Sequence, residues 1–185
     1  MKHILRRVVQ IIIILFAICI VVLWVYRNIV YPRKYRDIVE QASNIYNVDP
    51  NLIYSIIKQE SKFNQNAVSH SGAKGLMQLM DATAQDMAEN INGIDKNNID
   101  IYDPFTNIFL GTKYISYLTN HFDGNYYLAV VAYNAGIGNT KDWLDKDYKE
   151  YTKFYDVYEC IEYTETKNYL NNVIKNYNYY TKLYN

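Results

Sequence analysis

An unbroken run of 19 uncharged residues, from Val8 to Tyr26, constrains the fold of this chain more than any other feature. A helix of about 20 apolar residues is long enough to cross the hydrocarbon core of a bilayer. The run exceeds the apolar part of an ordinary cleaved signal peptide and no small-residue cleavage site follows it, while Trp24 and Tyr26 suit a membrane interface. We therefore predict an uncleaved transmembrane anchor over 8–26.

The anchor divides the 185-residue chain into unequal parts. Residues 1–7 would form a short cytoplasmic tail and residues 27–36 a basic linker, which leaves 37–185 for one domain of common size. Basic residues flank the anchor on both sides, so the positive-inside rule does not decide its orientation.

The charge of the chain is unevenly distributed. The whole chain has 19 basic and 19 acidic residues; seven of the basic and none of the acidic ones lie in 1–36, so 12 basic and 19 acidic remain in 37–185. A domain with a net charge of about −7 lacks the basic face that nucleic acid requires, so we expect no nucleic-acid partner. The two cysteines, Cys19 in the anchor and Cys160 in the domain, are not expected to form a disulfide and indicate no compartment.

The domain sequence is patterned for helices. Asp49 and Pro50 give a helix start, and the following residues place one apolar stripe at helical spacing: Leu52, Ile53, Ile56 and Ile57. We expect further helices over about 82–90, after Asp103-Pro104, over 126–133, and from 164 onward. Since no convincing alternating strand is present, the predicted class is all-α with one N-terminal transmembrane helix.

Glu60 continues the apolar stripe, three residues after Ile57 and four after Ile56. Its side chain should therefore point toward the apolar side of the helix. A desolvated carboxylic acid keeps its proton to higher pH, as a general acid must. The ordinary alternative is a glutamate that bends to solvent or pairs with Lys58 or Lys62.

Four segments, in this order, carry a family resemblance: Glu60-Ser61, Ser71-Gly72-Ala73-Lys74-Gly75-Leu76-Met77-Gln78-Leu79-Met80, Ala132-Tyr133-Asn134-Ala135-Gly136 and Glu165-Thr166-Lys167-Asn168-Tyr169-Leu170. Together they resemble the catalytic domain of the soluble lytic transglycosylases over about residues 38–180. The last segment has Lys and Leu where that family commonly has Arg and Val.

The resemblance implies a mostly helical, lysozyme-like fold that needs no metal or cofactor and whose cleft binds peptidoglycan glycan strands. It places the essential acid at Glu60 and the substrate-binding residues at Ser69, Ser71, Gln78, Met80, Thr83, Tyr133, Asn134 and Tyr169. The residue types agree: Gln78 offers a donor and an acceptor to an N-acetyl group, and Gly72 and Gly75 allow a close backbone approach to a sugar. For Met80, core packing is an equal alternative.

The implied reaction cleaves the β-1,4 bond between N-acetylmuramic acid and N-acetylglucosamine. The resemblance implies that Glu60 gives its proton to the leaving oxygen, the substrate's acetamido group stabilises the oxocarbenium-like centre, and ionised Glu60 then takes the C6 hydroxyl proton to form a 1,6-anhydro end. The domain would face the cell exterior, where peptidoglycan lies. Twenty-one tyrosines include a minority suited to packing against pyranose rings.

Asp81 departs from the family pattern, which commonly has proline there. We interpret it as a helix N-cap in preference to a catalytic group. Goose-type lysozymes, which hydrolyse the same bond, place an acid one position earlier, where this chain has Met80. A hydrolytic muramidase is therefore one alternative. A non-catalytic, membrane-tethered wall-binding protein is another, although an intact Glu60 counts against it.

Overall fold

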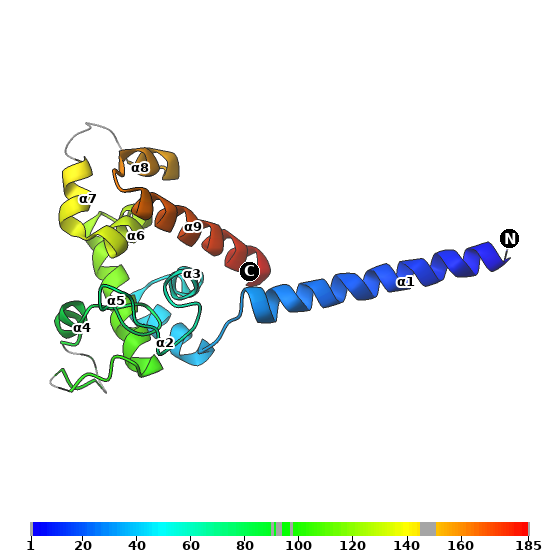
Figure 1. The fold of residues 1–185 in the computed structure, drawn as a ribbon, viewed down its shortest axis with the longest axis horizontal. Coiled ribbons are helices and arrows are strands. Elements are labelled where there is room, and N and C mark those ends of the chain that lie inside the picture. Colours follow the sequence, from blue (N-terminus) through cyan, green and yellow to red (C-terminus); the bar gives the residue numbers. More distant parts are fainter. Residues whose placement is uncertain (1, 90, 92–93, 97, 145–150, 185) are drawn as a thin grey trace. The chain divides into compact units, whose positions relative to one another are not determined.

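The computed structural model describes residues 2–89, 91, 94–96, 98–144 and 151–184 (Figure 1). Contacts within the chain divide it into two units, Met1–Lys34 and Tyr35–Asn185, and each is considered by itself.

The first unit is one long helix. The α-helix α1 (Lys2–Val25) continues into a π-helical turn, η1 (Tyr26–Val30), and no residue of α1 is buried. Among the described residues, Lys2–Val30 is the one helical stretch long and apolar enough to cross a membrane. The helix thus includes most of the predicted tail and the first four residues of the predicted linker. It ends just before Pro32, since proline disfavours a helical conformation in the residue that precedes it.

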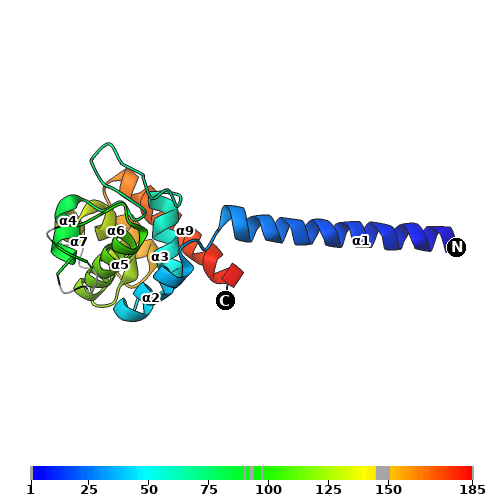
Figure 2. The same ribbon diagram turned by 90° about the horizontal axis from the view of Figure 1, so that it is seen from below.

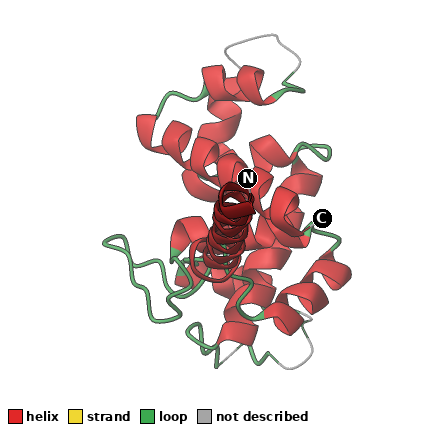
Figure 3. Ribbon diagram, turned by 90° about the vertical axis from the view of Figure 1, so that its right-hand side faces the viewer, coloured by secondary structure: helices red, strands yellow, loops and turns green. Residues whose placement is uncertain are grey.

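The elements of the second unit in its described part are all helices joined by loops, as Figure 3 shows. This confirms the predicted all-α class. The helices are α2 (Arg36–Tyr46), α3 (Pro50–Glu60), α4 (Asp81–Met87), α5 (Pro104–His121), α6 (Tyr126–Ala135), α7 (Ile137–Leu144), α8 (Phe154–Cys160) and α9 (Thr164–Tyr184).

The helix starts follow local chemistry. The Asp49 carboxylate accepts a hydrogen bond from the Asn51 amide at the start of α3, and Asp103 accepts one from Thr106 at the start of α5. Each aspartate is followed by proline, which fits the first helical position because its missing N–H is one that no helical carbonyl would bond. Both starts were predicted from the sequence.

Some predicted boundaries were wrong. The helix expected over 82–90 is α4, which begins at Asp81 and ends at Met87; Asn90 lies outside the described residues. The helix expected over 126–133 continues to Ala135 and stops before Gly136, whose φ of 84° only glycine adopts readily.

α5 lies in the middle of the second unit and packs against α2, α4 and α6, while α9 packs along α3 and α6 (Figures 1 and 2). The stripe of α3 is buried in this core, as predicted. The largest fully buried side chains are Tyr54, Tyr180, Ile53, Ile56, Ile57, Leu76, Met77, Leu79, Ile108, Leu110, Ile115 and Leu118. This packing brings the last turn of α3 against the first half of α9.

Candidate active site

Glu60 is the last residue of α3, and its side chain meets α9. The buried hydroxyl of Tyr169 donates a hydrogen bond of 2.6 Å to Glu60 Oε1. The two residues lie 109 positions apart in the chain and come together because α3 and α9 pack along each other. This contact directs Glu60 toward the packed side of its helix, as the apolar stripe predicted.

The surroundings of Glu60 shift its protonation strongly. Burial raises the pKa of the Glu60 carboxyl from 4.5 to about 7, and the hydrogen bond from Tyr169 acts against that rise by stabilising the ionised form. Near neutral pH the carboxyl is therefore present in both protonated and ionised forms. A group of this kind can donate and accept a proton at the same pH.

A second tyrosine lies close to the same charge. Tyr133, near the end of α6, donates a hydrogen bond of 2.9 Å to the Met77 carbonyl. Burial, and then the Glu60 charge, raise the pKa of both Tyr133 and Tyr169 well above 10. Both phenols therefore stay protonated and act as hydrogen-bond donors. Tyr133 connects the Glu60 region to the loop that carries Met77.

That loop, residues 61–80, is held by its own side chains. Ser61 Oγ donates a hydrogen bond of 2.7 Å to the Leu76 carbonyl, which ties the residue after Glu60 to the far end of the loop. Gln78 Nε2 donates to the carbonyls of Ala67 and Gly75 at 3.0 and 2.8 Å. The Gln78 donor that was expected to face substrate is thus engaged within the loop, and Oε1 is left as its acceptor.

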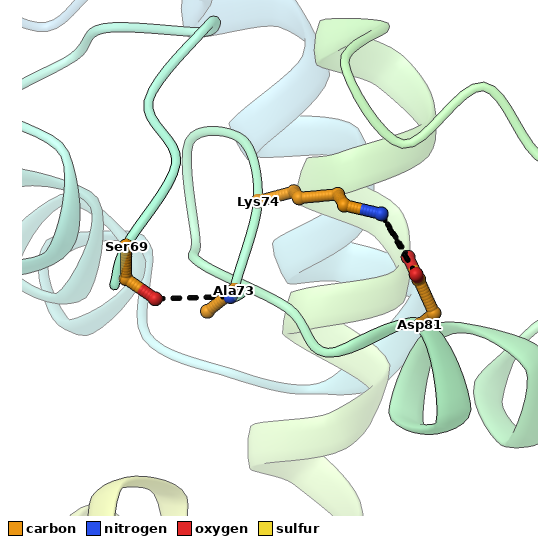
Figure 4. Close-up of polar contacts among 4 residues, drawn as sticks. All are labelled: Ser69, Ala73, Lys74 and Asp81. Atoms are coloured by element: carbon orange, nitrogen blue, oxygen red, sulfur yellow. Dashed lines mark hydrogen bonds and ion pairs between the residues drawn. The ribbon is translucent and has the colours of Figure 1, made fainter. Parts of the chain in front are cut away.

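Ser69 has a similar local contact. Its Oγ accepts a hydrogen bond of 2.9 Å from the Ala73 amide, which closes the tip of the loop (Figure 4). Ser71, within this tip, is exposed and its side chain makes no hydrogen bond to a described residue. The tip therefore presents the Ser71 hydroxyl to solvent.

Asn107, on α5, anchors the second half of the loop. Its fully buried amide accepts a hydrogen bond of 2.7 Å from the Met77 N–H and donates to the carbonyls of Lys74 and Ile101 at 3.0 and 2.8 Å. Gly75 allows this close approach: it has a φ of 80°, and a Cβ there would lie 2.2 Å from Asn107 Nδ2. One buried amide thus holds three segments together.

Asp81 does not cap α4. The N-cap is Met80, which has no side-chain hydrogen bond to the helix. Both carboxylate oxygens of Asp81 accept from Lys74 Nζ, at 2.8 and 2.7 Å (Figure 4). The interpretation of Asp81 as an N-cap was therefore wrong, because the ammonium group across the loop is a stronger partner than the helix amides.

The remaining predicted site residues differ in their surroundings. Asn134, at the end of α6, is exposed, and its Oδ1 accepts a hydrogen bond of 2.8 Å from the buried Thr166 hydroxyl on α9. Its Nδ2 donors are thereby turned away from Thr166. Met80 is 46% exposed, so it is not a core residue. Thr83, on α4, is half-buried and makes no side-chain hydrogen bond within the described part of the chain.

Sequence reasoning missed three positioning residues: Ser61, Asn107 and Thr166. Ser61 and Thr166 are small polar residues inside the quoted motifs: Ser61 directly follows Glu60, and Thr166 lies three residues before Tyr169. Asn107 gave a weaker signal, a carboxamide within an apolar helix, and such a residue when buried needs hydrogen-bond partners.

No group of three or more His, Cys, Asp or Glu side chains among the described residues could hold a metal ion.

Comparison with known proteins places the chain among described families. A family model described as the transglycosylase SLT domain matches residues 37–155. The soluble lytic murein transglycosylase of Escherichia coli K12 is 32% identical over 160 residues, covering 85% of this chain and 24% of that protein. A membrane-bound lytic murein transglycosylase C of Salmonella arizonae is 39% identical over 117 residues, covering 58% of this chain and 32% of that protein.

Solved structures give the same result. An inactive mutant of the lytic transglycosylase Slt from Pseudomonas aeruginosa has a TM-score of 0.73 and 33% identity, covering 83% of this chain and 25% of the other. The 70 kDa soluble lytic transglycosylase of Escherichia coli has a TM-score of 0.73 and 30% identity, covering 82% of this chain and 25% of the other. The chain spans about a quarter to a third of the length of these relatives. It belongs to the transglycosylase SLT domain family.

Proposed function

We propose that this chain is a membrane-anchored lytic transglycosylase that cleaves peptidoglycan glycan strands between N-acetylmuramic acid and N-acetylglucosamine. Family membership and the names of the relatives support the reaction class. The observation that carries the proposal is the half-buried Glu60 carboxyl, which accepts a hydrogen bond from Tyr169 and whose pKa is raised to about 7.

The mechanism follows from this protonation behaviour. Protonated Glu60 gives its proton to the glycosidic oxygen as the bond breaks, and the positive charge that develops at the sugar is stabilised by the substrate's own 2-acetamido group. Ionised Glu60 then removes the proton from the C6 hydroxyl, whose oxygen closes the 1,6-anhydro ring. A pKa near 7 supports both transfers at one pH, since neither form of the acid is rare.

The state of Asp81 supports the lyase over a hydrolytic muramidase. A glycoside hydrolase needs a second carboxylate: as a base if it inverts the anomeric configuration of the sugar, or as a nucleophile if it retains that configuration. Besides Glu60, Asp81 is the acid nearest in sequence to the proposed binding loop, and both its oxygens accept hydrogen bonds from Lys74. Asp81 is thus already engaged by an ammonium group, and the C6 hydroxyl, already part of the substrate, has the advantage of proximity over a water molecule.

We further propose that two walls bind the glycan. One consists of loop residues Ser69, Ser71 and Gln78 with Met80 and Thr83 at the start of α4. The other consists of Tyr133, Asn134 and Tyr169. The Thr166 hydroxyl supports this assignment of Asn134, because it engages Oδ1 and leaves the Nδ2 donors for a substrate carbonyl or hydroxyl.

We propose that α1 is a single-pass anchor, with the second unit on the outer side of the membrane, where its substrate lies. The length, composition and exposure of Lys2–Val30 support the anchor. The full-length protein should stay in membranes after alkaline carbonate washing, and protease should reach the domain in wall-permeabilised cells. Release by the wash would contradict the anchor, and complete protection from protease would contradict the orientation.

The role of Glu60 is tested by Glu60→Gln, which keeps the side-chain shape but has no transferable proton. We expect release of soluble muropeptides from purified peptidoglycan to fall by roughly two or more orders of magnitude. Glu40→Gln, at an exposed position on α2, is the matched control and should retain wild-type turnover. Near wild-type turnover by the Glu60 variant would reject Glu60 as the acid.

A further inference from the structure

A pocket of about 410 Å³ lies at the end of α3 opposite Glu60. Its walls come from the end of α2, the start of α3, the last turns of α5, the start of α6 and the middle of α9. A helix rises about 1.5 Å per residue, so the 11 residues of α3 separate this pocket from Glu60 by roughly 15 Å. The proposed reaction makes no use of it.

Three tyrosines give the pocket its aromatic surface: Tyr46, Tyr126 and Tyr177, each half-buried. The Tyr177 hydroxyl donates a hydrogen bond of 2.7 Å to Asp49, and the Tyr126 and Tyr177 rings lie 6.1 Å apart at 49° to each other. These rings are held in place and leave part of their surfaces open. Half-exposed rings at two inclinations suit the apolar faces of pyranose rings.

Two carboxamides add the polar part. Asn47 and Asn120 line the pocket, are exposed, and make no side-chain hydrogen bond within the described residues. Each offers both donors and an acceptor, the combination that pairs with neighbouring sugar hydroxyls or with an N-acetyl amide. Leu52 supplies an apolar wall on which an acetyl methyl can pack.

The charges of the lining favour a neutral ligand. Among the described residues, no lysine or arginine lines the pocket, so a phosphate or a peptide carboxylate would find no cation there. The one acid in its described lining, Asp49, already accepts a hydrogen bond from Tyr177 through Oδ2 and another from the Asn51 amide through Oδ1. The volume is within the usual range for small-molecule sites.

We propose that this pocket, which we call the tyrosine pocket, is a second saccharide site that binds N-acetylhexosamine units of a glycan strand. The identity of the sugar rests on the proposed function, because the same polymer would then occupy both sites. A second site would keep the enzyme on an insoluble network between cleavage events, since binding at two sites of one polymer raises the effective concentration at each.

The test uses the full-length Glu60→Gln protein in detergent micelles and chitotetraose, a soluble tetramer of N-acetylglucosamine, as the probe. Backbone amide NMR signals of Asn47, Asn120 and Gly124 should shift in a saturable manner during titration. A variant pair in one chain, Asn47→Gly together with Asn120→Ala, removes both carboxamides. It should weaken the affinity for chitotetraose, as read from these signals, by about tenfold. Glycine suits position 47 because its φ is 53°.

The outcomes separate this proposal from the proposed function. Signals near Gly75 and Tyr169 report the Glu60 site and should respond equally in the variant pair and its parent. Unchanged signals at Asn47, Asn120 and Gly124 would overturn the tyrosine pocket whether or not the Glu60 site binds. Shifts there with a stem peptide alone, but not with chitotetraose, would identify a peptide occupant and also overturn it.

Discussion

Tyr169 and Glu60 form a 2.6 Å hydrogen bond between α9 and the last residue of α3. A second bond of the same kind, from Tyr177 to Asp49, joins the two helices at the other end of α3. The two tyrosines are eight residues apart on α9, just over two helical turns, and so lie on nearly the same face. This pair of contacts fixes the register of α3 against α9 and thereby the position of the Glu60 carboxyl.

The first prediction concerns Tyr169→Phe. The hydroxyl lowers the pKa of Glu60 against the effect of burial, so its removal should raise that pKa above about 7. The alkaline fall in kcat/KM should then move to higher pH, with the maximum reduced by roughly tenfold through lost positioning. Rate profiles from pH 5 to 9 measure both effects.

Tyr163→Phe is the matched control for this change, because Tyr163 is 51% exposed and its ring remains to pack on Trp143. Its profile should overlay that of the wild type. An alkaline limb at the same pH in Tyr169→Phe would show that the hydroxyl does not set the Glu60 pKa.

The second prediction concerns stability. The pKa of Glu60 is raised on folding, so between pH 4.5 and 7 the unfolded chain has lost the proton that the folded chain retains. Stability therefore falls as pH rises through this window and stays lower above it. Glu60→Gln removes the ionisation and should be more stable than wild type above pH 7, by roughly 3 kcal/mol.

Thermal unfolding of the two proteins at pH 4 and pH 8 measures this difference, which should be small at pH 4 and large at pH 8. Glu40 lies in an exposed pair with Arg36, and the stability difference between Glu40→Gln and wild type should not increase from pH 4 to pH 8. Equal melting of wild type and Glu60→Gln at pH 8 would mean that the folded protein does not raise the Glu60 pKa.

The third prediction concerns Asn107→Ala. The change leaves the Met77 N–H and the carbonyls of Lys74 and Ile101 without their partner. We expect a loss of about 2–4 kcal/mol in unfolding free energy. Asn120→Ala, at an exposed position on the same helix, should change it by less than about 0.5 kcal/mol. Denaturant unfolding compares them, and similar values for both would show that the Asn107 network contributes little.

The fourth prediction concerns Asp81→Asn. The pair with Lys74 lies at the surface, so the melting temperature should be nearly unchanged. Because we assign Asp81 no part in the chemistry, the products should also keep their 1,6-anhydro ends. Loss of bond cleavage with intact folding would instead identify Asp81 as the second acid of a hydrolase.

Local signals predicted the parts of the fold that depend on neighbouring residues. The start of α3 at Asp49 and Pro50 and the buried stripe of α3 both follow from spacing within one helix. The position of Glu60 on that stripe predicted its raised pKa for the same reason.

The parts that the sequence did not predict depend on contacts between distant segments. Asp81 has the composition of an N-cap, yet Lys74 approaches it from across the loop. Gln78 was expected to present its amide to substrate, but the curled loop places two carbonyls within reach of Nε2. Asn107 acts on a segment 30 residues away, which no local pattern reveals.

The measurement that tests the central claim most directly is the mass of the glycan ends released from purified peptidoglycan by the full-length enzyme. Glu60 as acid and then base predicts 1,6-anhydro-N-acetylmuramic acid ends, lighter by one water than hydrolytic ends, and none with Glu60→Gln. Mainly reducing N-acetylmuramic acid ends would contradict the account and make the enzyme a muramidase.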